Sequence, residues 1–353
     1  MRLARLAVGL IAGLAWLAAA GLAAAQGGIE DRRVYPGTSD RVLRILSTAD
    51  LEVFDPYIRA FQQRNPSVGL DYGVVSSASL ARMIRDGADY DLALSSAMDL
   101  QFRLANDGHA RPHRSTATDA LPDWARWRDL IFAFTAEPAV VVVSTDGFGD
   151  LPLPATRRDL VTLLRDNPDR FRGRIGTYDV RESGLGYLFA TQDARATEAY
   201  WRLSEVMGRL GPRLYCCSAA MIDDLQRGEL ALAYNVLGSY VAHRLAREGE
   251  GRLAVVALED FANVMLRTGI VTAQAREPEL AGRFLDHLIR IGLRGSAGDW
   301  PLPALAGAGE GATTQVGPIR LGPGLMVNLD RLNRQGFLRA WENAVRQDLA
   351  PAP

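Results

Sequence analysis

Residues 213–240 read R-L-Y-C-C-S-A-A-M-I-D-D-L-Q-R-G-E-L-A-L-A-Y-N-V-L-G-S-Y, and this stretch predicts a strand, a helix and a second strand in that order. Ser218 is of a residue type that favours helix N-caps, so we expect a helix over residues 219–227. Gly228 follows at the place where a glycine commonly ends a helix. The stretch therefore has the strand–helix alternation of an α/β protein.

The apolar run at residues 230–233 predicts a short buried strand, and we expect the chain to reach the surface at Tyr234-Asn235. Cys217-Ser218 and Tyr234-Asn235 then both lie where a sheet meets its helices. Such edges are where α/β proteins bind small ligands, so Cys217, Ser218, Tyr234 and Asn235 are candidate ligand-binding residues.

The same alternation occurs upstream, where strands are predicted over residues 41–46, 68–75 and 90–94, each followed by a helix. Such alternation predicts a parallel sheet, in which the carboxyl ends of the strands share one edge. Each strand ends in a pair of hydroxyl side chains: Ser47-Thr48, Ser76-Ser77 and Ser95-Ser96.

Hydroxyl groups beside helix N-termini can bind an anion, which makes the three pairs candidate ligand-binding residues. The alternative is that each serine or threonine only caps its own helix. The sequence leaves both interpretations open.

The composition is that of a soluble globular protein of 353 residues, with 48% hydrophobic and 23% charged residues. The formal net charge of −1 gives no sign of a nucleic-acid-binding surface. The sequence contains no lysine, which excludes Schiff-base chemistry on the chain.

The N-terminus has a short basic start, an apolar run at residues 6–22 and three alanines before Gln26. This pattern predicts a secretory signal peptide over residues 1–25 and an exported, periplasmic protein, with an uncleaved anchor helix as the alternative. Residues 26–40 are polar and are expected to form a flexible leader.

Residues 130–144 predict two strands broken at Glu137-Pro138, where the chain crosses from a first lobe into a second. We expect residues 41–135 and 260–353 to form lobe 1 and residues 136–259 to form lobe 2. The chain is long enough for two such units.

Four segments in this order and spacing resemble one known family: I-L-S-T-A-D-L-E (45–52), Y-D-L-A-L-S-S-A (90–97), S-G-L-G (183–186) and residues 217–240. The sequence resembles periplasmic solute-binding proteins of ABC transporters, in the two-lobe branch that holds ferric-iron-binding proteins. Within that branch it is most similar to the phosphoglycerate transport regulatory type. The resemblance covers about residues 42–345.

The resemblance implies an α/β fold of two lobes, each a mostly parallel sheet flanked by helices, joined by two crossing strands. It also implies that the ligand is captured between the lobes by their closure. The partner is then an ABC permease or the periplasmic domain of a sensor kinase. No cofactor is implied, and we expect a monomer.

Iron binding is the less favoured ligand prediction. Ferric-binding members of this branch use adjacent tyrosines after the strand that matches residues 231–234, whereas this chain has Tyr234 and Tyr240 with five residues between them. His109 and His113 have a metal-ligand spacing only on a helix, and Pro112 stands between them. We therefore expect no metal site.

A small anion fits the remaining residues better. Arg181 lies just before Ser183-Gly184 at a predicted helix start, where its guanidinium could hold a phosphate or a carboxylate. The alternative is that Arg181 forms a surface ion pair with Glu182 or Asp179.

Cys216-Cys217 are the two cysteines of the sequence. They could form a vicinal disulfide, pair with another chain, or line the cleft as small buried thiols, which is the interpretation we favour. A catalytic thiol would need an adjacent base, and nothing in the sequence places His243, the nearest histidine, beside these cysteines.

The predicted function is capture of a small anionic solute (an organophosphate, a phosphonate or a carboxylate) for ABC-type uptake. The alternative is a sensor component that presents the solute to a histidine kinase. An enzyme is not expected, because the sequence shows no metal cluster and no base-activated nucleophile.

Overall fold

The structure is a computed structural model, and it describes residues 28–248, 252–295, 300–308 and 316–347. The predicted signal peptide, residues 1–25, lies outside these ranges. None of the helices within them combines the length and the apolar character that a membrane span requires.

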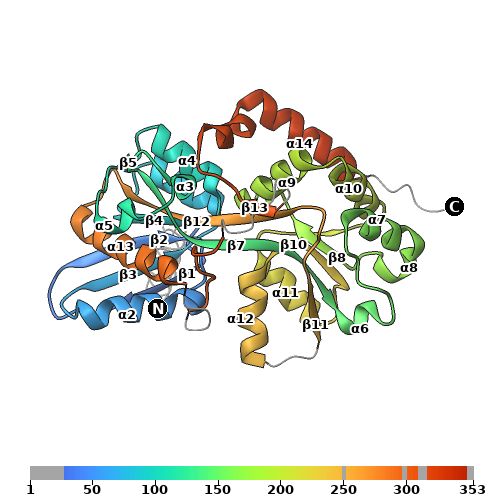
Figure 1. Ribbon diagram of the computed structural model, residues 1–353, viewed down its shortest axis with the longest axis horizontal. Helices are drawn as coiled ribbons and strands as arrows, with labels where there is room; N and C mark the ends of the chain where they lie inside the picture. Colours follow the sequence, from blue (N-terminus) through green and yellow to red (C-terminus); the bar gives the residue numbers. More distant parts are fainter. Residues whose placement is uncertain (1–27, 249–251, 296–299, 309–315, 348–353) are drawn as a thin grey trace, which may run out of the picture.

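The described strands form a 13-stranded sheet that bends into two halves, and each half carries helices on its faces (Figure 1). The strand order along the main path is β1-β3-β2-β4-β12-β7-β10-β8-β9. The strands are β1 (Asp31–Tyr35), β2 (Val42–Ser47), β3 (Gly69–Val74), β4 (Leu92–Ser95), β5 (Ala110–Arg111), β6 (Arg126–Trp127), β7 (Ile131–Ser144), β8 (Ile175–Tyr178), β9 (Arg213–Tyr215), β10 (Leu232–Leu237), β11 (Leu253–Val256), β12 (Ala262–Thr272) and β13 (Val316–Pro318).

Both halves have a parallel centre, because β2 pairs with β3 and β4 in parallel, and β8 pairs with β9 and β10 in parallel. This confirms the predicted two-lobe α/β fold. The helices are α2 (Leu51–Arg64), α3 (Ser77–Arg85), α4 (Met98–Asn106), α5 (Thr116–Asp119), η1 (Asp123–Ala125), α6 (Thr145–Phe148), α7 (Arg157–Asp166), α8 (Pro168–Phe171), α9 (Gly184–Ala196), α10 (Ala199–Arg209), α11 (Ser218–Gln226), α12 (Gly238–Glu248), α13 (Pro278–Arg294), η2 (Pro323–Leu329) and α14 (Arg331–Val345).

Strand β7 runs through both halves without interruption, whereas the sequence predicted a break at Glu137-Pro138. Up to Pro138 it pairs with β12 of the first lobe, and from Ala139 it pairs with β10 of the second. Pro138 therefore stands where β7 changes partners, a position at which its missing N–H does not interrupt either ladder. Strand β12 is the second long strand at this crossing (Figure 1).

The N-terminal segment is more ordered than predicted. Residues 31–35 form β1, an edge strand antiparallel to β3, where we expected a flexible leader. Its side chains explain the order: Arg32 forms an ion pair with Asp71 at 2.5 Å, and the Tyr35 hydroxyl donates to Asp55 at 2.8 Å. The leader prediction overlooked these partners, which come from residues further along the chain.

Helix α14 contacts the second lobe, whereas residues 260–353 as a whole are expected in lobe 1. Helix η2 lies against α4, and α14 packs on α10 (Figure 1). Trp341 and Val345 of α14 share a buried cluster with Val180 and Tyr200.

Candidate functional site

The first-lobe edge holds the three predicted hydroxyl pairs. The first member of each pair stabilises the chain turn that follows its strand. The Oγ atoms of Ser47 and Ser95 accept the backbone N–H two residues on, at 3.0 and 3.1 Å, and both residues are fully buried. Ser76 caps α3 by accepting the N–H of Ser79 at 3.2 Å. Of these three residues, Ser76 alone matches the capping alternative. Ser47 and Ser95 instead stabilise the turns ahead of α2 and α4, whose N-caps are Asp50 and Ala97.

The second members lie closer to one another. The Thr48 Oγ1 atom accepts the N–H of Ser96 at 3.1 Å and lies 3.3 Å from the Ser96 Oγ atom. This bond joins the ends of β2 and β4. Ser77 is the first residue of α3, and its side chain points at the second lobe, as described below.

The second-lobe edge is formed by the ends of β8, β9 and β10. Ser183 caps α9 through the N–H of Gly186 at 3.1 Å. The prediction that Ser218 caps α11 is wrong. Cys217 occupies the N-cap position, and Ser218 is the first residue of the helix. The Ser218 Oγ atom instead accepts the N–H of Leu237 at 3.1 Å and lies 2.6 Å from the Tyr178 hydroxyl.

Tyr234 and Asn235 are buried inside the second lobe, so the expectation that the chain surfaces there is wrong. The Tyr234 hydroxyl and the Asn235 amide both donate to Asp193 Oδ2 at 2.8 Å. Asn235 has a φ of 63°, at the irregularity where β10 shifts its pairing with β7. Asparagine tolerates this left-handed conformation, which explains its presence inside a strand.

The centre of this buried network is Asp193 of α9, which the sequence analysis missed. It also accepts from Arg157 at 3.1 Å and from Asn263 at 2.9 Å. Burial raises the pKa of Asp193, and the Arg157 charge opposes that rise. The available signal was a single charged residue in a helix segment that is otherwise uncharged, L-F-A-T-Q-D-A (188–194).

Arg181 is engaged in the ion pair that the sequence left open as the alternative. Its Nε and Nη2 atoms donate to the two carboxylate oxygens of Asp179 at 2.8 and 2.5 Å. Its remaining nitrogen lies 3.7 Å from Glu342, and the guanidinium lies over the Trp341 ring of α14. Arg181 therefore helps to hold α14 rather than offering a free fork to a ligand.

In the part of the chain that the structure describes, the two edges contact each other at the start of α2 and at the start of α9. The backbone N–H of Asp50 donates to the Tyr240 hydroxyl at 3.3 Å, which joins the start of α2 to α12. At the second place a Cβ atom added to Gly184 would lie 2.7 Å from the Ser77 Oγ atom. The N-termini of α3 and α9, from opposite lobes, therefore approach each other with almost no space between them.

Behind the first contact, the crossing strands carry a fully buried ion pair. Arg267 of β12 donates from Nε to Glu137 of β7 at 2.9 Å, and Ser239 of α12 donates to the same carboxylate at 2.6 Å. The Nη1 atom of Arg267 has no hydrogen-bond acceptor within the described residues. Burial raises the pKa of Asp50, and the charge of Arg267 opposes that rise.

Two further predictions concern metal and thiols. His113, one of the two histidines considered as metal ligands, has its Nε2 atom 2.8 Å from the Asp286 Oδ1 atom and so links the segment after β5 to α13. Cys216 and Cys217 are both exposed, whereas we favoured buried thiols. Their Sγ atoms lie 3.1 Å apart.

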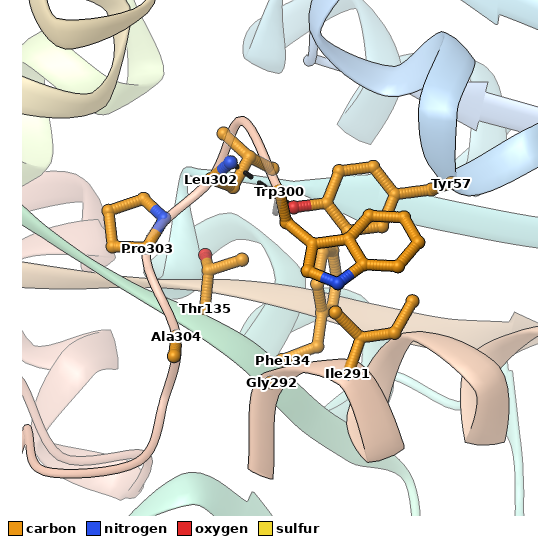
Figure 2. A pocket seen from close by; sticks show the side chains of 9 residues that line it. All are labelled: Tyr57, Phe134, Thr135, Ile291, Gly292, Trp300, Leu302, Pro303 and Ala304. Atoms are coloured by element: carbon orange, nitrogen blue, oxygen red, sulfur yellow. Dashed lines mark hydrogen bonds between the residues drawn. The ribbon is translucent and has the colours of Figure 1, made fainter. Parts of the chain in front are cut away.

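A small hollow elsewhere in the first lobe does not compete as a ligand site. Figure 2 shows Tyr57, Phe134 and Trp300 around it, with the Tyr57 hydroxyl accepting the Leu302 N–H at 3.1 Å. Its free volume of about 10 Å³ can hold at most one water molecule.

A family model and a solved structure that match this chain are both of solute-binding proteins. Residues 43–290 match the family model described as "bacterial extracellular solute-binding protein". The structure of the substrate binding protein of an ABC transporter from Agrobacterium tumefaciens is similar at 32% identity and a TM-score of 0.83, covering 90% of this chain and 99% of that one. The comparison with curated proteins finds no match.

More distant structures share the fold. AfuA from Actinobacillus pleuropneumoniae, solved with fructose-6-phosphate bound, has 16% identity and a TM-score of 0.69, with 88% of this chain and 100% of that chain covered. Iron-bound HitA from Pseudomonas aeruginosa has 15% identity and a TM-score of 0.62, with 86% and 99% covered.

Proposed function

Because this chain belongs to the family of bacterial extracellular solute-binding proteins, we propose that it captures a small anionic solute between its two lobes for uptake by an ABC transporter. Solute binding for ABC transport is the property of the family. The anionic class of the solute, its place between the lobes and the export of the chain are our proposal.

The observation that carries the proposal is the approach of two helix N-termini from opposite lobes. Helices α3 and α9 begin at Ser77 and Gly184, which nearly touch. The backbone N–H groups of these two residues have no hydrogen-bond acceptor within the described ranges. A helix N-terminus carries about half a positive charge, so an anion that lies beside both ends would be stabilised by both of them.

The chemistry of the surrounding residues fits an oxyanion. Ser77 and the Thr48–Ser96 pair supply hydroxyl donors at the same edge of the first lobe. Because Arg181 is bound to Asp179, the proposed site recognises the anion through N–H and O–H groups rather than through a guanidinium fork. The bound fructose-6-phosphate of AfuA supports a phosphate-bearing solute as the first choice.

We expect a thermal-shift screen of organophosphates, phosphonates and carboxylates to contain at least one compound that raises the melting temperature. A ligand that binds only the folded state raises the free energy of unfolding, by about 2.7 kcal/mol at a ligand concentration one hundred times its Kd, and therefore raises the melting temperature. Chloride at equal ionic strength is the control. A screen in which Fe³⁺ alone stabilises the protein would contradict the anionic solute.

The Gly184→Val variant should lose this response to the solute. Even the first added atom would lie 2.7 Å from both the Ser77 Oγ and the Leu100 Cδ1 atoms, so the lobes could not reach their present approach. We expect at least about a tenfold loss of affinity, equivalent to 1.4 kcal/mol, measured by calorimetry with the compound found above.

Gly336→Val in α14 is the matched control, because a Cβ atom there meets open space. It should bind the solute as the parent protein does. Equal affinity of Gly184→Val and Gly336→Val would refute the placement of the solute at the α3–α9 approach.

The partner implied by family membership is an ABC permease. A sensor kinase as partner, the phosphoglycerate transport regulatory subtype and a monomeric state remain predictions. A pull-down with the exported domain of a neighbouring kinase would test the first of these.

A further inference from the structure

Cys216 and Cys217 lie between β9 and α11, and both side chains are exposed with their Sγ atoms 3.1 Å apart. The hydrogen bond between the thiols lowers the pKa of Cys216 to about 7. Cys217 is the N-cap of α11, and the hydrogen bond with Cys216 together with burial raises the pKa of its thiol. The pair is thus an accessible dithiol in which one sulfur is a nucleophile near neutral pH.

The two thiols are poorly suited to form a disulfide with each other. Consecutive Cα atoms are about 3.8 Å apart across a trans peptide, whereas disulfides usually join Cα atoms about 4.4–6.8 Å apart. The structure has no cis peptide bond in its described residues. A disulfide here would distort the backbone and would be reduced easily, so the dithiol form is the favoured one.

The charges around the dithiol determine which ligands it tolerates. The charged side chains that act most strongly on the two thiols are carboxylates: Glu30 and Glu182 on Cys216, and Asp50 on Cys217. An anion would be repelled at this position. A neutral compound with high affinity for sulfur would not be.

The number and arrangement of the sulfur ligands also limit which elements the dithiol can bind. Zinc prefers four tetrahedral ligands, and the described residues contain no group of three or more His, Cys, Asp or Glu side chains that could hold a metal ion. An ion that binds two sulfurs on opposite sides does not fit thiols of adjacent residues 3.1 Å apart. A pyramidal trivalent centre binds both sulfurs on one side and keeps a third ligand of its own.

We propose that Cys216 and Cys217 form a binding site for trivalent arsenic, supplied as neutral arsenous acid. Two As–O bonds break and two As–S bonds form. The two thiol protons leave with the two hydroxyl groups as two water molecules, the third hydroxyl stays on arsenic, and no atom changes its oxidation state. This inference goes beyond the proposed function and does not depend on it.

The test is a titration of the reduced full chain with arsenite at neutral pH. We expect one arsenic per chain, new ultraviolet absorbance from the As–S bonds, and loss of both thiols that a thiol reagent detects. The Cys216→Ser and Cys217→Ser variants should each bind arsenite at least about tenfold more weakly, because the second As–S bond forms within one molecule. Melting curves without arsenite check that the variants fold.

Two results would overturn the proposal: single variants that bind arsenite as tightly as the parent protein, or parent protein that binds no better than the double serine variant. A Ser77→Ala variant separates this proposal from the preceding one. It should weaken the response to an anionic solute and leave arsenite binding intact, whereas failure of arsenite binding alone would leave the solute proposal standing.

Discussion

Glu137→Gln is expected to destabilise the protein by about 3–5 kcal/mol, because it removes the charge that compensates the fully buried Arg267. Arg267 already has one nitrogen without an acceptor within the described residues, so the interior offers it little else. Thr135 and Ser239 donate to the two carboxylate oxygens of Glu137 at 2.8 and 2.6 Å, and the glutamine would replace one of these acceptors with an NH2 group. Urea denaturation followed by tryptophan fluorescence would measure the loss.

Two controls make the result specific. Glu277→Gln makes the same chemical change in the exposed Arg41–Glu277 pair and should change stability far less. The double variant Glu137→Leu/Arg267→Met should recover most of the loss, since apolar residues of similar volume often replace a buried ion pair without penalty. If Glu137→Gln were as stable as Glu277→Gln, the buried pair would not hold the crossing strands together.

Asp193→Asn should produce a loss of similar size, about 3–5 kcal/mol. Four side chains donate to this carboxylate, from α7, β10 and β12: Arg157, Tyr234, Asn235 and Asn263. An amide in its place would turn N–H groups toward some of these donors and leave the Arg157 charge without its buried partner. Unfolding in urea, monitored by circular dichroism, is the measurement.

Asp260→Asn is the comparison for this prediction. Asp260 is the other carboxylate on Arg157, at 3.0 Å, but its side chain is 26% exposed, so water can replace part of its role. We expect a distinctly smaller loss than for Asp193→Asn. Equal losses would show that Asp193 is one acceptor among several rather than the centre of the network.

The regular parts of the fold were predictable because they follow from local patterns. The three strands that end in hydroxyl pairs predicted the parallel centre of the first lobe. Gly228, with a φ of 73°, follows the end of α11 as expected for a helix-terminating glycine. Those signals lie within a few residues of the structure that they specify.

The errors concern partners that lie far apart in the sequence. Tyr234 looked like an edge residue because a polar group ends an apolar run, but Asp193 and Arg157, 41 and 77 residues away, bind its hydroxyl inside the lobe. Pro138 suggested a strand break because proline has no N–H for a sheet hydrogen bond. In the structure β7 changes its partner strand at this residue, and that change depends on strands far away in the sequence. The approach of Ser77 to Gly184 likewise depends on how the lobes are placed, which no local pattern encodes.

The return of the C-terminal helix to the second lobe has a practical consequence. The chain leaves β12 and β13 in the first lobe, passes η2 against α4 and ends on α10 through α14. A fluorescent reporter fused after α14 would therefore be attached to the second lobe and move with it, and a reporter inserted ahead of β1 would move with the first lobe. Such a pair of fluorophores would read out the separation of the lobes directly.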